Sequence, residues 1–236
     1  MGVIAKLSIA LPMLFAAVIV PGGPTRAQQS PVTAIDILLV PDQTMVRHAN
    51  DANARLRKAF PKGFALGAPH NPRITTLQRY IQTTDLDKVY AAVGNVLASE
   101  LVTTWKLKAF KYYYIPVGEI GVAGTIMEST DDLHRLQQKL IDAVAPFTAK
   151  TGTAAAFFST KGGRDIYPGL IEYVADFVPK SSGKNFNPHV TIGVASQDYL
   201  KKMLAEPFEP FTFSPAGVAV YHLGTFGTAQ KKLRSW

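Results

Sequence analysis

The sequence predicts an α+β fold of two pseudo-symmetric lobes, each an antiparallel sheet with outer helices, around a central groove. Two observations carry this prediction. The order strand, helix, strand, helix occurs once before residue 121 and again after it. The second strand of each half also carries a similar word, Arg73-Ile74-Thr75 in the first half and His189-Val190-Thr191 in the second. Duplicated units usually pack about a pseudo-twofold axis, which would bring the two words together across the groove.

Composition favours an exported protein held together by its core alone. The chain has 236 residues, is 47% hydrophobic and contains no cysteine, so no disulfide can staple it. Its first 27 residues resemble a secretory signal, with an apolar run at Leu7–Val20 that is short for a membrane span. Their removal would lower the formal charge from +8 to +6. We expect one two-lobed domain over residues 28–236, periplasmic or secreted, monomeric and without a membrane span.

The elements of the first half follow from periodicity and stop signals. Thr33–Val40 is an apolar run ended by Pro41-Asp42, which is typical of a buried strand. Thr44–Phe60 contains no Gly or Pro and repeats apolar residues at helical spacing. The same arguments predict a strand at Arg73–Ile81 and a helix at Asp85–Ser99 with Thr84 or Asp85 as its N-cap.

The second half opens with two segments rich in Thr, Val, Tyr and Phe, Leu101–Ile115 and Gly121–Glu128, which are predicted as strands. Thr130 can cap a helix whose apolar stripe extends to Val144. Further elements are expected as a strand at Leu170–Val178, the His189 strand, a helix at Gln197–Ala205 capped by Ser196, and strands at Phe211–Phe213 and Ala216–Leu223.

The His189 strand has apolar residues at alternate positions. Side chains of a strand alternate between its faces, so one face would be buried and the other would line the groove. We expect Val190, Ile192 and Val194 on the core face, and His189, Thr191 and Gly193 on the groove face. An imidazole and a hydroxyl about 7 Å apart can hold a small anion. The same pattern also occurs on ordinary polar strand faces, and the second word at Arg73 is what favours a site.

These words resemble the signature of the two-histidine (2H) phosphoesterase superfamily, in particular its bacterial 2′-5′ RNA ligase or RNA 2′,3′-cyclic phosphodiesterase-like branch. The family pattern is His-x-Thr/Ser, twice. His189-Val190-Thr191 matches it, whereas Arg73-Ile74-Thr75 is degenerate because Arg stands where His is expected. The segments Ile35–Pro41, Leu77–Ile81 and Leu223–Gln230 also resemble this branch, so the resemblance covers essentially all of residues 28–236.

The resemblance implies a hydrolase that opens 2′,3′-cyclic phosphate ends of nucleotides or RNA without a metal or other cofactor. One imidazole would activate water while hydroxyls hold the phosphoryl oxygens. Guanidinium stays protonated, so Arg73 can bind phosphate but cannot relay a proton, and activity is expected to be reduced. The expected catalytic residues are His189, Thr191 and Thr75, and the expected substrate-binding residues are Arg73, His70 and Tyr80.

The alternative is a catalytically degenerate nucleotide- or phosphate-binding protein of the same fold. It would keep the phosphate ligands of both words and lack the proton relay. His70 leaves a choice open, since it either reaches the groove from its loop or is a turn residue. At least one of Tyr112, Tyr113 and Tyr114 must face away from the core, where it can stack on a base or serve packing.

Overall fold

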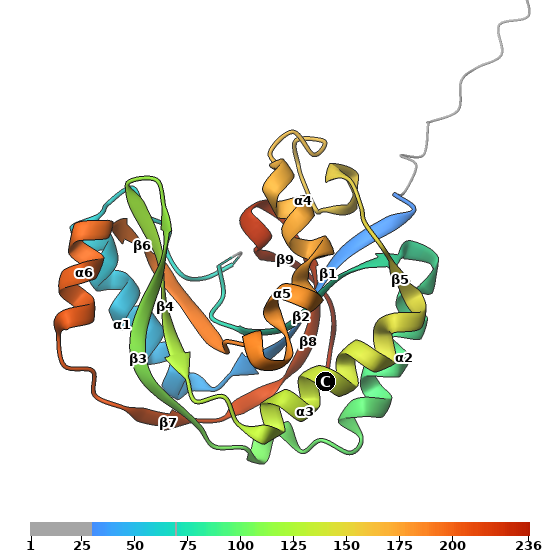
Figure 1. The fold of residues 1–236 in the computed structure, drawn as a ribbon, viewed down its shortest axis with the longest axis horizontal. Helices are drawn as coiled ribbons and strands as arrows, with labels where there is room; N and C mark the ends of the chain where they lie inside the picture. Colours follow the sequence, from blue (N-terminus) through green and yellow to red (C-terminus); the bar gives the residue numbers. More distant parts are fainter. Residues whose placement is uncertain (1–29, 69) are drawn as a thin grey trace, which may run out of the picture.

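Two antiparallel sheets covered by helices form the fold, which we describe from a computed structural model over residues 30–68 and 70–236 (Figure 1). The first sheet has the strand order β5-β2-β1-β8-β9 and the second the order β6-β4-β3-β7. Every pair of neighbouring strands is antiparallel. The predicted α+β class, with two antiparallel sheets and outer helices, is confirmed.

The described residues form strands and helices with the following bounds. The strands are β1 Val32–Pro41, β2 Ile74–Gln82, β3 Leu107–Val117, β4 Ile120–Met127, β5 Thr148–Ala149, β6 His189–Ser196, β7 Phe211–Phe213, β8 Pro215–Leu223 and β9 Ala229–Ser235. The helices are α1 Gln43–Ala59, α2 Leu86–Leu97, α3 Asp131–Val144, α4 Pro168–Ala175, α5 Phe177–Ser181 and α6 Gln197–Ala205. The signal predicted at residues 1–27 lies outside the described residues. In the part of the chain that the structure describes, no helix has both the length and the apolar character needed to cross a membrane.

The helix ends follow the expected capping chemistry in most places. Thr130 accepts a hydrogen bond from the Leu133 N–H at the start of α3, and Ser196 caps α6 in the same way, as predicted. The cap predicted for the second helix is confirmed in position, since Asp85 is the N-cap of α2, but not in its bonding. A 3₁₀ turn over Thr83–Asp85 leads into α2, and Asp85 makes no side-chain capping bond.

The strand predicted at Leu170–Val178 is wrong, because this segment forms α4 and α5. Pro168 stands at the first turn of α4, where its fixed φ favours a helix start. Leu170, Val174 and Phe177 are buried at helical spacing. A short apolar run is compatible with either a strand or a helix. Here the segment packs its buried residues against β2 as the helices α4 and α5 (Figure 1).

The first helix of each half crosses to the sheet of the other half. α1 packs against β6, and α3 packs against β2. In Figure 1, α1 and α6 accordingly flank the β6-β4-β3 sheet, while α2 and α3 lie together against the other sheet. The order β1-α1-β2-α2 in the first half thus corresponds to β4-α3-β6-α6 in the second. This is the internal repeat that the sequence indicated.

Each strand that carries a motif word has a β-bulge directly after the threonine. In β2 the pairing with β1 skips Thr76, and in β6 the pairing with β4 skips Ile192. A bulge shifts the alternation of side chains by one position. The predicted faces of β6 are therefore wrong beyond Ile192. A Cβ on Gly193 (φ 148°) would lie 3.0 Å from Leu56 Cδ1 of α1. This glycine thus allows α1 to pack closely and does not widen the groove.

A buried amide on each crossing helix satisfies the carbonyl of the bulged residue. Asn53 of α1 donates from Nδ2 to the Ile192 carbonyl at 2.8 Å and to the Phe64 carbonyl at 3.1 Å. Its Oδ1 accepts from the Leu66 N–H at 3.2 Å. One side chain thus ties α1 to the bulge of β6 and to the loop that precedes β2.

Gln137 of α3 makes the equivalent bonds in the other lobe. Its Nε2 donates to the Thr76 carbonyl at 3.0 Å and to the Ser181 carbonyl at 3.2 Å, and its Oε1 accepts from the Gly183 N–H at 3.3 Å. Asn53 and Gln137 are both buried. The two lobes are therefore related in their polar core as well as in their order of elements.

Replacing either amide by leucine should destabilise the protein, because buried carbonyls lose their donors. We expect Asn53→Leu and Gln137→Leu each to lower the free energy of unfolding by about 1–3 kcal/mol, or more where several groups lose partners together. Urea denaturation measures this. Gln138→Leu is the matched control, since Gln138 is exposed on α3 and its side chain bonds, within the described residues, to Asp142 alone. A Gln137→Leu variant as stable as Gln138→Leu would contradict the role of the amide.

Candidate functional site

The two motif words lie on one cavity of about 510 Å³ between the sheets. Arg73 and Thr75 line it from β2 and the residue before it, while His189 and Thr191 line it from β6. The sequence thus predicted four residues that the structure brings together. Further residues from β2 and β3, from α4 and α5, and from the loops before α4, before β6 and after β8 complete the wall, among them Gln78, Tyr113, Tyr167, Tyr173, Asn187 and Phe226.

The backbone fixes the tautomer of His189. Its Nδ1 lies 2.7 Å from the Asn187 carbonyl, which can only accept, so Nδ1 carries the proton and Nε2 keeps a free lone pair. Burial lowers the pKa of His189, and the charge of Arg73 lowers it further, although the bond to Asn187 acts in the opposite direction. The imidazole is therefore neutral at neutral pH and can take up a proton.

Tyr113 holds the His189 ring from the side. The two rings meet edge to face, with centroids 5.1 Å apart. A Cβ on Gly124 of the neighbouring strand would clash with the Tyr113 ring, so this glycine makes space for the tyrosine. Of the three tyrosines considered in the sequence, Tyr113 is the one that lines the cavity.

Arg73 forms an ion pair with Asp36 of β1, which the sequence interpretation missed. Arg73 Nε donates to Asp36 Oδ2 at 3.2 Å, and Arg73 Nη2 donates to the Gly227 carbonyl at 2.8 Å. Thr75 Oγ1 also donates to Asp36 Oδ2, at 3.1 Å. The single hydroxyl proton of Thr75 is thus committed to Asp36, and its oxygen faces a ligand only as an acceptor.

Asp36 has 0% exposed surface. Burial raises its pKa to about 6, although Arg73 and Thr75 both act to lower it. A signal for this group was present in the sequence. Asp36 is the one charged residue within the apolar run Thr33–Val40, and a carboxylate in a buried strand requires a partner.

Two of the predicted substrate-binding residues lie elsewhere. His70 stacks on Phe64 with ring centroids 4.2 Å apart and does not line the cavity, as expected of a turn residue. Tyr80 is buried, and its hydroxyl donates to the Ile171 carbonyl at 3.0 Å. Tyr80 is buried because α4 covers this end of β2, whereas the sequence had predicted a strand in place of α4.

An aromatic rim stands at the edge of the cavity. Phe226 is 77% exposed and has a positive φ of 57°, a conformation that costs a bulky residue about 1–3 kcal/mol. The loop holds it there, because Thr225 Oγ1 donates to Asp165 Oδ2 at 2.8 Å and Arg73 bonds to Gly227. The Tyr167 ring lies 6.1 Å from the Phe226 ring. A planar ligand can stack on such a rim.

The described residues offer no metal site. Across residues 30–68 and 70–236, no three His, Cys, Asp or Glu side chains gather closely enough to hold an ion. The motif residues bring to the cavity one neutral imidazole, one fixed guanidinium and the oxygens of two threonines, and tyrosine hydroxyls and side-chain amides also line it.

The likeness to known proteins lies in the fold. No family model matches the sequence, and a search of curated proteins finds no match. The chain is similar to TT0787 of Thermus thermophilus, with a TM-score of 0.51 and 19% identity over 86% of this chain and 97% of that chain. It is also similar to E. coli LigT complexed with 3′-AMP (TM-score 0.45, 10% identity, 88% and 98% covered) and to Kluyveromyces marxianus Usb1 (TM-score 0.40, 8% identity, 87% and 97% covered). The match to TT0787 establishes a shared two-lobed α+β fold.

The raised pKa of Asp36 should be visible as a pH dependence of stability. The folded protein binds this proton more tightly than the unfolded chain, whose carboxyl has a pKa near 3.8. Asp36 therefore lowers the free energy of unfolding progressively as the pH rises from about 4 to about 6, and the effect is complete above that range.

We expect the free energy of unfolding of the wild type, minus that of Asp36→Asn, to fall between about pH 4 and pH 6 and then to level off. Urea denaturation of both proteins across this range measures it. Shifts of the histidines are common to both proteins and largely cancel. A difference that grows with pH would show instead that Arg73 holds the pKa of Asp36 below its ordinary value.

Proposed function

We propose that this protein is a metal-independent phosphodiesterase of the 2H type that opens 2′,3′-cyclic phosphate ends of nucleotides or RNA with a single histidine. The observation that carries the proposal is His189. Its Nδ1–H is held by the Asn187 carbonyl, and its basic Nε2 shares a cavity with the cationic Arg73. A base next to a fixed positive charge suits attack of water on a phosphate diester.

The reaction needs one proton taken and one proton given. His189 Nε2 takes a proton from water as the water oxygen attacks phosphorus, and the bond from phosphorus to one ribose oxygen breaks. Arg73 stabilises negative charge on the phosphoryl group, but its guanidinium does not release a proton, so the leaving oxygen is protonated by solvent. A missing acid reduces the rate by about 10²–10⁴-fold, and turnover should be slow.

One observation favours the alternative, a nucleotide-binding protein without turnover. Asp36 holds both Arg73 and Thr75, so the β2 side of the cavity supplies charge and shape but no mobile proton. Such a site would bind nucleotide phosphates saturably and in a salt-sensitive way without cleaving them.

The function is tested with adenosine 2′,3′-cyclic phosphate in the presence of a chelator. We expect slow conversion to adenosine monophosphate by the wild type and loss of it in His189→Ala, because the base that activates water is removed. His48→Gln is the matched control, since His48 is exposed on α1 and stacks on Phe211. Binding of the nucleotide with no turnover above buffer would decide for the alternative.

A second test rebuilds the missing imidazole. Arg73→His alone would leave the buried Asp36 without its cation, which is a destabilised arrangement. We therefore expect the double variant Asp36→Asn with Arg73→His to gain more activity than the single variant, up to about 10²–10⁴-fold over the wild type. Turnover and melting temperature are measured together. In a binding protein the same changes would weaken nucleotide affinity and leave turnover absent, because a charge-assisted contact is lost.

A further inference from the structure

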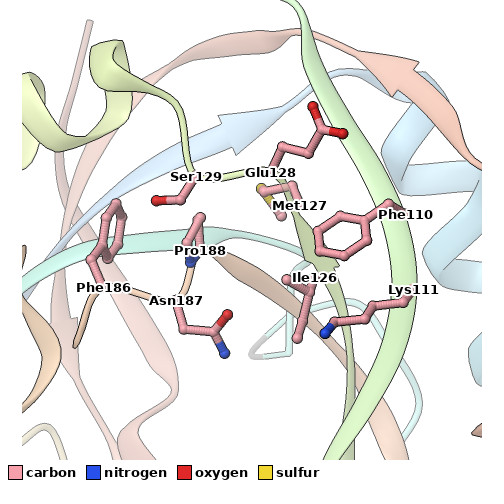
Figure 2. A pocket seen from close by; sticks show the side chains of 9 residues that line it. All are labelled: Phe110, Lys111, Ile126, Met127, Glu128, Ser129, Phe186, Asn187 and Pro188. Atoms are coloured by element: carbon pink, nitrogen blue, oxygen red, sulfur yellow. The ribbon is translucent and has the colours of Figure 1, made fainter. Parts of the chain in front are cut away.

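A second pocket of about 420 Å³ adjoins the central cavity (Figure 2). Phe186 and Asn187 line both, so the short segment before His189 is the wall between them. Figure 2 shows the rings of Phe186 and Phe110 on opposite sides of the pocket, with the side chains of Asn187 and Lys111 extending toward one another. A ligand that fills the central cavity can continue into this pocket past Asn187.

A β-bulge shapes this second pocket. The pairing of β3 with β4 skips Phe110, because Ala109 pairs with Met127 and Lys111 with Ile126. Consecutive strand residues normally face opposite ways, yet here Phe110 and Lys111 both line the pocket, and Lys111 Nζ lies 5.3 Å from the centre of the Phe110 ring. The bulge thus places an aromatic ring and a cation together beside the His189 site.

Asn187 connects the pocket to the central site. Its carbonyl accepts the Nδ1–H of His189, while its side chain is exposed and, among the described residues, makes no hydrogen bond. An amide offers a donor and an acceptor side by side, which matches the edge of a nucleobase. Glu128, the acidic residue of this pocket, forms an ion pair with Lys108 at 2.9 Å, which offsets part of its charge.

We propose that this second pocket binds the nucleoside that precedes the terminal one, so that the protein acts on the ends of oligoribonucleotides in preference to free mononucleotides. The inference rests on the proposed function of the central cavity. The base of the penultimate nucleoside lies between Phe110 and Phe186, its edge meets the Asn187 amide, and the phosphodiester that joins the two nucleosides lies near Lys111. The terminal base stacks on the rim of Tyr167 and Phe226.

The proposal is tested by comparing adenosine 3′-phosphate with the dinucleotide ApAp, which carries the same 3′-phosphate, in binding to the full chain by calorimetry. Stacking of one base contributes about 5- to 150-fold in affinity, so ApAp should bind the wild type more tightly by a factor in this range. Phe110→Ala should bring ApAp close to the affinity of adenosine 3′-phosphate and leave the latter unchanged. Phe208→Ala is the matched control, since Phe208 packs on Tyr112 outside both pockets.

Lys111→Gln supplies a second variant on an exposed position that has little influence on folding. It should lower the salt dependence of ApAp binding by about 0.7 in log K against log salt, the value of one phosphate contact on a single strand. The salt dependence of adenosine 3′-phosphate binding should not change.

The outcomes separate the two proposals. Equal affinity of the wild type for ApAp and adenosine 3′-phosphate overturns the second pocket alone. If Phe110→Ala lowers the affinity for both ligands equally, the second pocket is also overturned. Phe110 would then stabilise the whole site and would not bind the second base. Failure of the wild type to bind ApAp also overturns the second pocket, whereas the proposed function is overturned by the absence of turnover of adenosine 2′,3′-cyclic phosphate.

Discussion

The carbonyl of each bulged residue needs a donor inside the protein, and the rest of the site depends on how Asn53 and Gln137 provide one. A bulge turns the strand and frees a backbone group, which costs free energy when it is buried without a partner. The amide comes from the helix of the opposite half, so neither lobe can complete its motif strand alone. The crossing of α1 and α3 therefore fixes the two strands relative to each other, and with them the cavity in which Arg73 and His189 lie.

The Arg73–Asp36 pair explains how an arginine can stand at this position. A buried carboxylate is expensive to desolvate, and removing its cation would leave an uncompensated charge, so the two residues are bound to each other in stability. The bond from Arg73 to the Gly227 carbonyl extends this coupling to the loop that carries Phe226. The guanidinium thus has two roles. It places a fixed charge in the cavity, and its bond to Gly227 holds the loop that carries Phe226.

Periodicity predicted most of the elements because their packing is regular. The helices α1, α3 and α6 each bury one apolar stripe, and Thr130 and Ser196 cap α3 and α6, so periodicity predicted all three and capping residues marked the start of two. The placement of four motif residues in one cavity also followed, since the two halves repeat. α4 was mistaken for a strand because a short apolar run fits both, and Tyr80 was misplaced as a consequence. The bulges at Thr76, Phe110 and Ile192 leave no periodic signal, since each depends on a partner strand far away in the sequence.

The bulge on β3 has a different effect from those on β2 and β6, because it positions a side chain that lines a pocket. In β2 and β6 the extra residue directly follows the motif threonine, and its carbonyl accepts a hydrogen bond from a side-chain amide of a helix. In β3 the side chain of the extra residue, Phe110, lines the second pocket beside Lys111. The same face of β3 carries Tyr113 and Lys111, two residues apart, so one strand borders both the His189 imidazole and the second pocket. Asn187 accepts the Nδ1–H of His189 with its backbone carbonyl and also lines the second pocket, so this one residue belongs to both sites.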